Sequence, residues 1–234
     1  MSSKPTLTVI GATGNLGAPV VKHLALMGYP VKAIVRNPEK AEKLFAGLSG
    51  VEIYRANLQR VGELRPALAG STHVYLNLST NTVDRTLPFY EEREGVANIL
   101  EAIDPTAIRQ ILCISGLGAF DNVAPTGDFS FVPNLIRKQG HRLIKDSGIP
   151  YTFLHCTSFL DNFVLYRRKG AYSVIGSTQF PIHFTNCYDY SRHLARAIDN
   201  RTRCTANSPF RECSPTATKK PRRPSWRPST RKPR

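Results

Sequence analysis

The sequence lacks the features that would place a protein in a membrane or in an oxidising compartment. No apolar run approaches the ~20 residues that cross a bilayer, and residues 1–5 contain no apolar signal region. The five cysteines are widely spread and include no C-x-x-C pair, so we expect reduced thiols and neither disulfides nor a zinc site. His183 and His193 also lack the spacing of metal ligands. We therefore expect a cytoplasmic protein with no membrane partner and no bound metal.

Residues 201–234 lack valine, leucine, isoleucine and methionine, unlike the rest of the chain. They hold 11 of the 32 Lys and Arg residues and one of the 17 acidic residues, so this segment carries +10 of the net charge of +15. Such a segment cannot bury enough apolar surface to offset the entropy lost on ordering. We predict a disordered basic tail that follows a single domain over residues 1–200.

The cluster Lys219–Arg223 within this tail admits more than one interpretation. Clusters of this kind act as nuclear import signals or as nucleic-acid patches. A solvated tail is the favoured interpretation, so nucleic acid is not an expected partner and a nuclear location is the alternative to the cytoplasm. The change of composition after Asn200 is also typical of a splice or reading-frame variant.

Residues 1–200 alternate apolar, β-branched runs with helical patterns. The apolar runs predict strands at 6–10, 31–35, 51–55, 73–78, 110–115 and 151–155. Helices are predicted at 16–27, 38–46, 61–69, 89–103, 134–147 and 189–199. Several strands are apolar throughout, as expected where both faces of a sheet are covered. This order of elements predicts an α/β fold with a doubly wound parallel sheet.

The first predicted strand leads directly into a turn with three glycines, and a helix follows. Gly11 permits a tight turn, Gly14 lets the backbone approach a pyrophosphate, and Gly17 lets the helix lie close to the sheet. Backbone N–H groups at the start of such a helix point at a phosphate, which the helix dipole also favours. The turn therefore predicts a dinucleotide site, the alternative being an ordinary tight turn between a strand and a helix.

The second predicted strand ends at Arg36, where a protein that binds NAD would carry an acidic residue. An acid repels the 2′-phosphate of NADP, whereas an arginine binds it through two hydrogen bonds. One charge-assisted hydrogen bond contributes about 1.5–3 kcal/mol, so Arg36 favours NADP over NAD. A solvated surface arginine is the alternative.

Over residues 5–200 the chain resembles the NmrA-like proteins, which are atypical short-chain dehydrogenases. The motifs that carry the resemblance are GATGNLG (11–17), VRNP (35–38), ILCISGLGA (111–119) and SGIPYTFL (147–154). The resemblance implies a Rossmann domain that binds NADP(H), with the adenine beside Asn57 and the 2′-phosphate at Arg36. The other cofactor-binding residues that it implies are Thr13, Gly14, Asn15 and Leu16 at the phosphates, Asn37, and Ser79, Thr80 and Ser115 toward the nicotinamide.

Short-chain dehydrogenases use a Tyr-x-x-x-Lys pair, and no tyrosine in this chain has a lysine four residues later. The resemblance indicates instead a catalytic lysine in the helix before SGIPYT. Lys138 is the best match, with Arg137 one residue away and an ordinary surface lysine as the alternative. His155 and Cys156 end a predicted strand and would line a pocket there, although no base accompanies Cys156 as a nucleophile.

Two further features concern the helix predicted at 89–103 and the region after Asn200. Glu91, Glu92 and Glu94 begin that helix, and we expect a solvated first turn in which the acids are favoured by the helix dipole. NmrA-like proteins usually continue with a small substrate-covering region, where this chain changes to Pro, Arg and Ser. The resemblance therefore implies a substrate pocket that is built only in part.

These observations favour an NADPH-dependent oxidoreductase that passes a hydride to a small carbonyl, quinone or enone. The alternative is a protein that senses NADP(H) and regulates a protein partner without turnover. The missing Tyr-x-x-x-Lys pair supports the alternative, and the residues at the strand ends support the enzyme.

Overall fold

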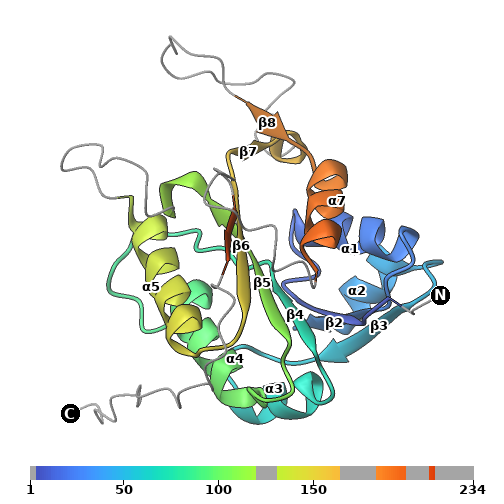
Figure 1. Cartoon of the computed structure of the whole chain (residues 1–234), viewed down its shortest axis with the longest axis horizontal. Helices are drawn as coiled ribbons and strands as arrows, with labels where there is room; N and C mark the ends of the chain where they lie inside the picture. The colour runs from blue at the N-terminus through green and yellow to red at the C-terminus, as the bar shows by residue number, and fades with distance from the viewer. Residues whose placement is uncertain (1–3, 120–130, 164–182, 199–210, 214–234) are drawn as a thin grey trace.

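The computed structural model describes residues 4–119, 131–163, 183–198 and 211–213 (Figure 1). Within these ranges a central sheet has the strand order β3-β2-β1-β4-β5-β6-β9, and all its strands are parallel except β9. The parallel strands are β1 (Leu7–Ile10), β2 (Val31–Val35), β3 (Val51–Arg55), β4 (His73–Leu76), β5 (Gln110–Gly116) and β6 (Tyr151–Cys156). The order 3-2-1-4-5-6 is that of doubly wound nucleotide-binding sheets, so the predicted fold class is confirmed.

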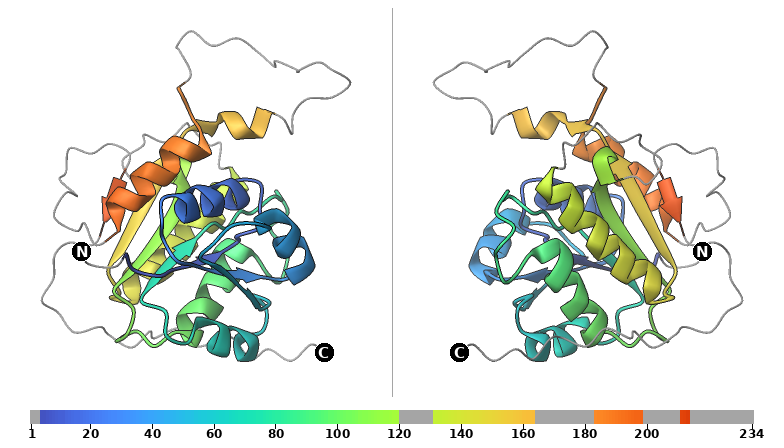
Figure 2. Two further views of the ribbon diagram at one scale, coloured as in Figure 1. Left: turned by 90° about the vertical axis from the view of Figure 1, so that its right-hand side faces the viewer. Right: turned by 90° about the vertical axis from the view of Figure 1, so that its left-hand side faces the viewer.

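Helices cover both faces of this sheet (Figure 2). One face carries α1 (Gly17–Leu26), α2 (Pro38–Phe45) and α7 (Cys187–Ala197). The other carries α3 (Val61–Leu68), α4 (Val96–Ala102) and α5 (Val132–Asp146). Among these described helices, none combines the length and the apolar composition needed to cross a bilayer.

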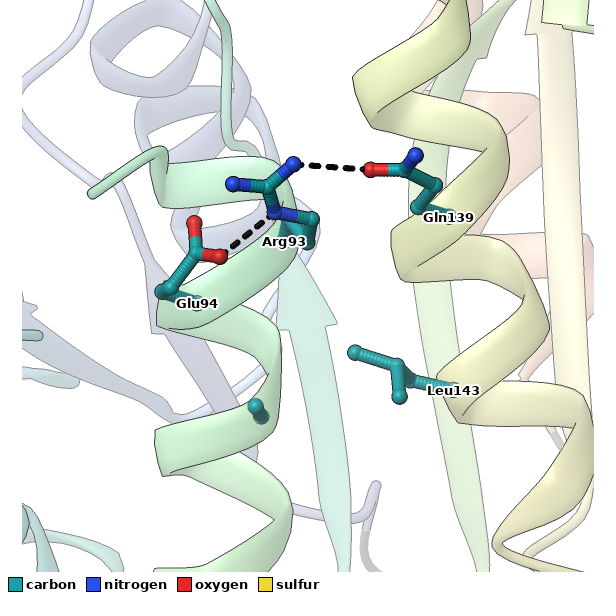
Figure 3. A pocket seen from close by; sticks show the side chains of 5 residues that line it. Arg93, Glu94, Gln139 and Leu143 are labelled. Atoms are coloured by element: carbon teal, nitrogen blue, oxygen red, sulfur yellow. Dashed lines mark hydrogen bonds and ion pairs between the residues drawn. The ribbon is translucent and has the colours of Figure 1, made fainter. Parts of the chain in front are cut away.

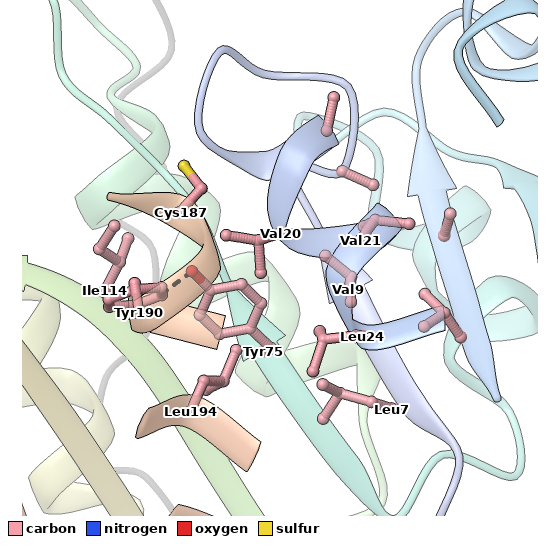
Figure 4. Packing of buried hydrophobic residues seen from close by; sticks show 14 of the residues in the cluster. Leu7, Val9, Val20, Val21, Leu24, Tyr75, Ile114, Cys187, Tyr190 and Leu194 are labelled. Carbon is pink, nitrogen blue, oxygen red and sulfur yellow. Dashed lines mark hydrogen bonds between the residues drawn. The ribbon is translucent and has the colours of Figure 1, made fainter. Parts of the chain in front are cut away.

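Each face of the sheet has its own apolar core. On the face of α1 and α7, Leu24 and Leu194 are fully buried and pack over the strand residue Val9 (Figure 4). On the opposite face, Leu64 of α3 and Ile144 of α5 pack over the central strands. Burial on both faces explains why several strands, such as β5, are largely apolar, because neither set of their alternating side chains contacts water.

The helix predicted at 89–103 is divided in two. Its first part is a π-helical turn, η1 (Glu91–Gly95), in which the N–H of Gly95 donates to the carbonyl of Tyr90, and α4 follows. A π turn adds a residue to the turn and changes which side chains face the sheet. The apolar periodicity of the segment did not reveal this change.

Short elements lie beyond the carboxyl ends of β5 and β6. They are the 3-10 turns η2 (Leu117–Ala119) and η3 (Leu160–Asn162) and a two-stranded parallel ladder of β7 (Ser158–Phe159) and β8 (Phe184–Thr185). Figure 1 shows β7 and β8 beyond the end of β6, on the side of the sheet where the strands point.

Part of the predicted basic tail is ordered. Residues Arg211–Cys213 form β9, which pairs antiparallel with β6 so that Arg211 lies opposite Leu154 and Cys213 opposite Thr152. The prediction of disorder is wrong at these residues, because pairing with a sheet edge uses backbone groups and needs no apolar side chain. The rest of 201–234, with the Lys219–Arg223 cluster, lies outside the described residues.

Candidate functional site

The glycine turn joins β1 to α1 as the sequence predicts. Gly11 has φ +82°, a backbone conformation that L-residues with side chains rarely adopt. The N–H of Gly14 donates to the carbonyl of Gly11 at 3.1 Å, and that of Ala18 donates to the carbonyl of Gly14 at 2.9 Å. The chain thus turns within a few residues from the strand into the helix.

Gly11 and Gly17 lie in close contact with Asn77, the residue after β4. A Cβ atom on Gly11 would lie 2.2 Å from the carbonyl oxygen of Asn77. A Cβ on Gly17 would lie 2.8 Å from Asn77 Nδ2 and 2.1 Å from the carbonyl oxygen of Gly11, and one on Gly14 would lie 3.7 Å from Nδ2. The predicted role of Gly17 in close packing is therefore confirmed, because a side chain there would collide with the carbonyl of Gly11 and with the amide of Asn77.

Asn77 was missed by the sequence analysis. Its backbone N–H donates to the carbonyl of Ile10 at 2.9 Å, and its Nδ2 makes a long hydrogen bond of 3.5 Å to the carbonyl of Gly11. The available signal was a polar residue directly after an apolar strand. That signal gains meaning only once β4 is known to pair with β1.

The start of α1 has the properties of an anion site. Leu16 is the N-cap, and it provides no side-chain cap for the first N–H groups of the helix. Gly14 and Asn15 are exposed, and Thr13 is half-buried. The N–H of Ala18 donates to Gly14 and Pro19 has none, so the N–H groups at this helix start without a partner in the described chain are those of Asn15, Leu16 and Gly17. Backbone N–H groups in this position suit the phosphates of a dinucleotide, so the residues present fit the group that the turn predicts.

The end of β2 presents Arg36 to solvent. Arg36 makes no hydrogen bond or ion pair with any residue that the structure describes, so its guanidinium is available to a ligand. Asn37 is the N-cap of α2, because its Oδ1 accepts from the N–H of Lys40 at 3.0 Å. The side-chain oxygen of Asn37 therefore orients the helix, and its amide NH₂ is the group left to contact a ligand.

Asn57 lies two residues after β3 and is half-buried. Its Oδ1 accepts from the N–H of Gln59 at 3.0 Å, and its own N–H donates to Glu63 Oε2 at 3.0 Å. The turn held by these bonds uses the side-chain oxygen of Asn57, the group that could accept from the amine of an adenine. A carbonyl oxygen has two lone pairs, so one acceptor position remains.

The predicted residues at the ends of β4 and β5 differ in exposure. Ser79 is exposed, and its hydroxyl donates to Asn81 Oδ1 at 2.9 Å. Thr80 is 95% buried, and within the described chain its hydroxyl has no hydrogen-bond partner, although its N–H donates to Glu92 Oε2 at 2.8 Å. Ser115 is buried with its hydroxyl 3.4 Å from the carbonyl oxygen of Gly116. A buried hydroxyl without a partner is rare, so the Thr80 hydroxyl is a candidate to bond a polar group of a ligand.

Glu92 and Arg137 form a buried ion pair at these strand ends. Arg137 Nε donates to Glu92 Oε1 at 2.6 Å and Nη2 donates to Oε2 at 3.4 Å, and the two side chains are 17% and 6% exposed. The expectation of a solvated Glu92 is wrong, because the π turn and α5 pack it inward. Gly140 of α5 lies so close that a Cβ there would contact the carbonyl oxygen of Glu92.

Arg137 is the α5 residue that contacts the strand ends. Its Nη1 would lie 3.1 Å from a Cβ on Gly116, at the end of β5. Lys138 is half-buried on the same helix and makes no hydrogen bond or ion pair to the described residues. Of the two registers that the sequence left open, the structure brings Arg137 against β5. The catalytic role of Lys138 stays a prediction.

His155 and Cys156 end β6 in surroundings that disfavour nucleophilic chemistry. His155 is 2% exposed, with Nδ1 3.3 Å from the carbonyl oxygen of Gly116. Burial raises the pKa of the Cys156 thiol to about 12, so the thiolate is scarce at neutral pH. Cys156 is therefore a poor candidate for a nucleophile.

A hollow of about 330 Å³ lies elsewhere, between η1 with α4 and α5 (Figure 3). Arg93 crosses it, donating to Glu94 on its own turn and to Gln139 of α5. None of the predicted cofactor residues lines this hollow, whose other lining residues are Ala97 and Leu143. It belongs to the helix layer and not to the strand ends.

A parallel doubly wound sheet with a glycine turn after β1 and an uncapped helix behind it defines a dinucleotide-binding Rossmann protein. The comparison with protein families agrees and is more specific. The chain belongs to the NAD(P)H-binding family, whose profile matches residues 11–179.

The chain is similar to proteins with different printed functions. An NAD(P)H azoreductase of Xenophilus azovorans is 27% identical over 170 residues, covering 71% of this chain and 54% of its own. The photosystem II assembly factor Ycf39 of Cyanophora paradoxa is 26% identical, covering 72% and 49%. An NADPH-dependent quinone oxidoreductase of Escherichia coli, solved with NADPH, superposes with a TM-score of 0.54 at 26% identity, covering 68% and 51%. The chain spans about half the length of the curated relatives it matches.

Replacing Gly17 by alanine is expected to weaken NADPH binding at least about tenfold, because the new Cβ would push against the backbone of Gly11 and displace the turn. Gly62→Ala is the matched control, since a Cβ on this α3 residue meets no atom within 4 Å. We expect it to leave binding unchanged and to add up to about 1 kcal/mol of stability. Isothermal titration and urea unfolding measure both effects; equal NADPH affinity in Gly17→Ala would contradict the assignment.

The thiol of Cys156 is expected to resist alkylation in the folded protein. With a pKa of about 12 its thiolate population at pH 8 is roughly a thousandfold lower than that of a free cysteine, and it grows only as the pH approaches 12. Iodoacetamide labelling followed by peptide mass spectrometry, in native buffer and in urea, measures the difference. Labelling of native Cys156 at the rate seen in urea would show that the thiol is not suppressed.

Proposed function

We propose that this protein is an NmrA-like reductase that binds NADP(H) and transfers a hydride to a small carbonyl, quinone or enone. The observation that carries the proposal is the glycine turn packed against Asn77, which leaves the start of α1 uncapped beside an exposed loop. Family membership supports NAD(P)H binding, and relatives that include an azoreductase and a quinone oxidoreductase support reduction.

The preference for NADP over NAD rests on Arg36. Its guanidinium is exposed at the end of β2 and has no partner among the described residues. In this proposal Arg36 binds the 2′-phosphate, the NH₂ of Asn37 assists, and Asn57 contacts the adenine. The E. coli quinone oxidoreductase and a Citrobacter triphenylmethane reductase, both solved with NADPH or NADP(H), support this preference.

The reacting end of the site would lie at the carboxyl ends of β4 and β5, where doubly wound sheets bind their ligands. When bound there, NADPH supplies a hydride to a carbon of the acceptor. The buried hydroxyl of Thr80 and that of Ser115 would donate to polar groups of the ligand. Arg137, fixed by its ion pair with Glu92, would direct N–H groups past Gly116 toward the molecule that accepts the hydride. Lys138 would supply the proton to the acceptor oxygen.

A regulatory protein that binds NADP(H) without turnover is the second candidate. The observations that favour it are the missing Tyr-x-x-x-Lys pair and the suppressed thiol of Cys156. The similarity to a photosystem II assembly factor also supports it, since that printed function is assembly and not reduction. In this candidate function the cofactor site is the same, and a protein partner binds differently when NADP(H) is bound.

Substituting Arg36 by glutamate is expected to invert the cofactor preference. The carboxylate repels the 2′-phosphate, so NADPH should bind about ten- to a hundredfold more weakly while NADH gains affinity. Dissociation constants for both nucleotides, measured by the fluorescence of the reduced nicotinamide, test this. Lys40→Glu on the neighbouring helix makes the same charge change and should alter the ratio little. Equal affinity of the wild type for NADPH and NADH would remove the role of Arg36.

Turnover separates the two candidates. NADPH oxidation against quinones, enones and aldehydes should proceed in the wild type, and Lys138→Gln should lower kcat about a hundredfold with the NADPH dissociation constant unchanged. Lys22→Gln, which removes another half-buried helix lysine, is the control and should retain kcat. Cofactor binding without oxidation on any acceptor would favour the regulatory protein. An unchanged kcat in Lys138→Gln would exclude that lysine as the proton donor.

A further inference from the structure

A line of polar groups crosses the apolar core between α7 and the glycine turn. The hydroxyls of Tyr190, on α7, and Tyr75, on β4, lie 3.2 Å apart (Figure 4), and the hydroxyl of Tyr75 lies 3.2 Å from Asn77 Oδ1. Asn77 Nδ2 then reaches the carbonyl of Gly11. Tyr75 and Tyr190 are 0% and 2% exposed, so their hydroxyls are bonded inside the core, and Asn77 at the end of the line is half-buried.

The direction of donation along the line follows from the number of protons. A tyrosine hydroxyl carries one proton, and Asn77 Oδ1 can only accept. Tyr75 therefore donates to Asn77 and accepts from Tyr190, whose proton completes the line. Burial raises the pKa of both tyrosines well above 10, so each keeps the proton that it donates.

Packing alone does not account for these hydroxyls. Both rings lie in the apolar cluster with Val20, Leu24 and Leu194, where phenylalanine would fill nearly the same volume. Burying a hydroxyl in such surroundings is unfavourable unless it is hydrogen-bonded. The bonded pair instead orients the amide of Asn77. Because Oδ1 of Asn77 accepts from Tyr75, its Nδ2 points toward the glycine turn.

The helix at the far end of the line is held against α1. Cys187 Sγ lies 3.8 Å from the carbonyl oxygen of Leu16, the ring of Tyr188 meets that of His23 edge-on at 5.3 Å, and Tyr29 donates to the carbonyl of Ala195 at 3.4 Å. These contacts fix α7 along α1, so the hydroxyl of Tyr190 has a defined position.

We propose that Tyr75 and Tyr190 are positioning residues for the cofactor: they orient Asn77, which fixes the carbonyl of Gly11 and thereby the turn that receives the pyrophosphate. This inference rests on the proposed binding of NADP(H) and adds that the docking of α7 contributes to cofactor affinity. It concerns the pyrophosphate only, because Arg36 lies at the end of β2, away from this line.

Two ligands separate this role from a general structural one. NADPH carries the pyrophosphate, whereas adenosine 2′-phosphate carries only the parts assigned to Arg36, Asn37 and Asn57. Tyr75→Phe should raise the dissociation constant of NADPH about three- to tenfold, the effect expected from one buried hydrogen bond. The same variant should change that of adenosine 2′-phosphate less than about twofold, measured by competition. Tyr190→Phe should weaken NADPH less, and the double variant should resemble Tyr75→Phe, since both remove one line.

Ser71→Ala is the matched control, because it removes a buried hydroxyl pair, Thr8 with Ser71 at 2.8 Å, near the opposite ends of the strands. It should lower the Tm as the tyrosine variants do and leave NADPH binding unchanged. An unchanged NADPH affinity in Tyr75→Phe, or an equal loss for adenosine 2′-phosphate, overturns the inference while the proposed function stands. A wild type that binds no NADPH removes both. If Tyr75→Phe does not fold, Tyr190→Phe at the far end of the line decides in the same way.

Discussion

The contact between the glycine turn and Asn77 is the constraint on which the rest of the structure depends. β1 and β4 are neighbours in the sheet, and each is followed by a connection that must leave from the same edge. Only backbone without Cβ atoms lets the two connections come this close, which requires glycine at positions 11 and 17. The same approach sets the direction of α1, and with it the place where a phosphate meets the helix.

The strand ends carry a second constraint, which is electrostatic. Glu92 enters the interior from a π turn, and a buried carboxylate must be paired and hydrogen-bonded. Arg137 and the N–H of Thr80 supply this, so α5, η1 and the end of β4 are joined through one side chain. A π turn at such a place agrees with the frequent occurrence of these turns at functional sites. The Glu92–Arg137 pair thus holds α5, η1 and the segment after β4 in fixed positions around the predicted reacting end of the site.

Much of the fold was predictable because it depends on local signals. Apolar runs and helix signals placed the strands and helices of the sheet; the helix predicted from residue 38 begins at Pro38, and Gly11 makes the predicted tight turn. Three features were not predictable because they depend on neighbours distant in sequence. Asn77 has meaning only beside Gly11, Glu92 turns inward only against Gly140, and the choice between Arg137 and Lys138 depends on the rotation of α5. Arg36 was recognisable by its position after the second strand. Its binding of a 2′-phosphate stays a prediction, because that interaction depends on the ligand as well as on the chain.

β9 has a consequence for how the molecule behaves among its copies. It pairs with Thr152, Phe153 and Leu154 and so covers part of an outer strand whose N–H and C=O groups would otherwise face solvent. Uncovered edges are templates on which a strand of another molecule can add. Because β9 is only three residues long, the edge that it presents is shorter than that of β6, which has six residues. A chain that ends at Asn200 would expose that edge of β6 to its neighbours in solution.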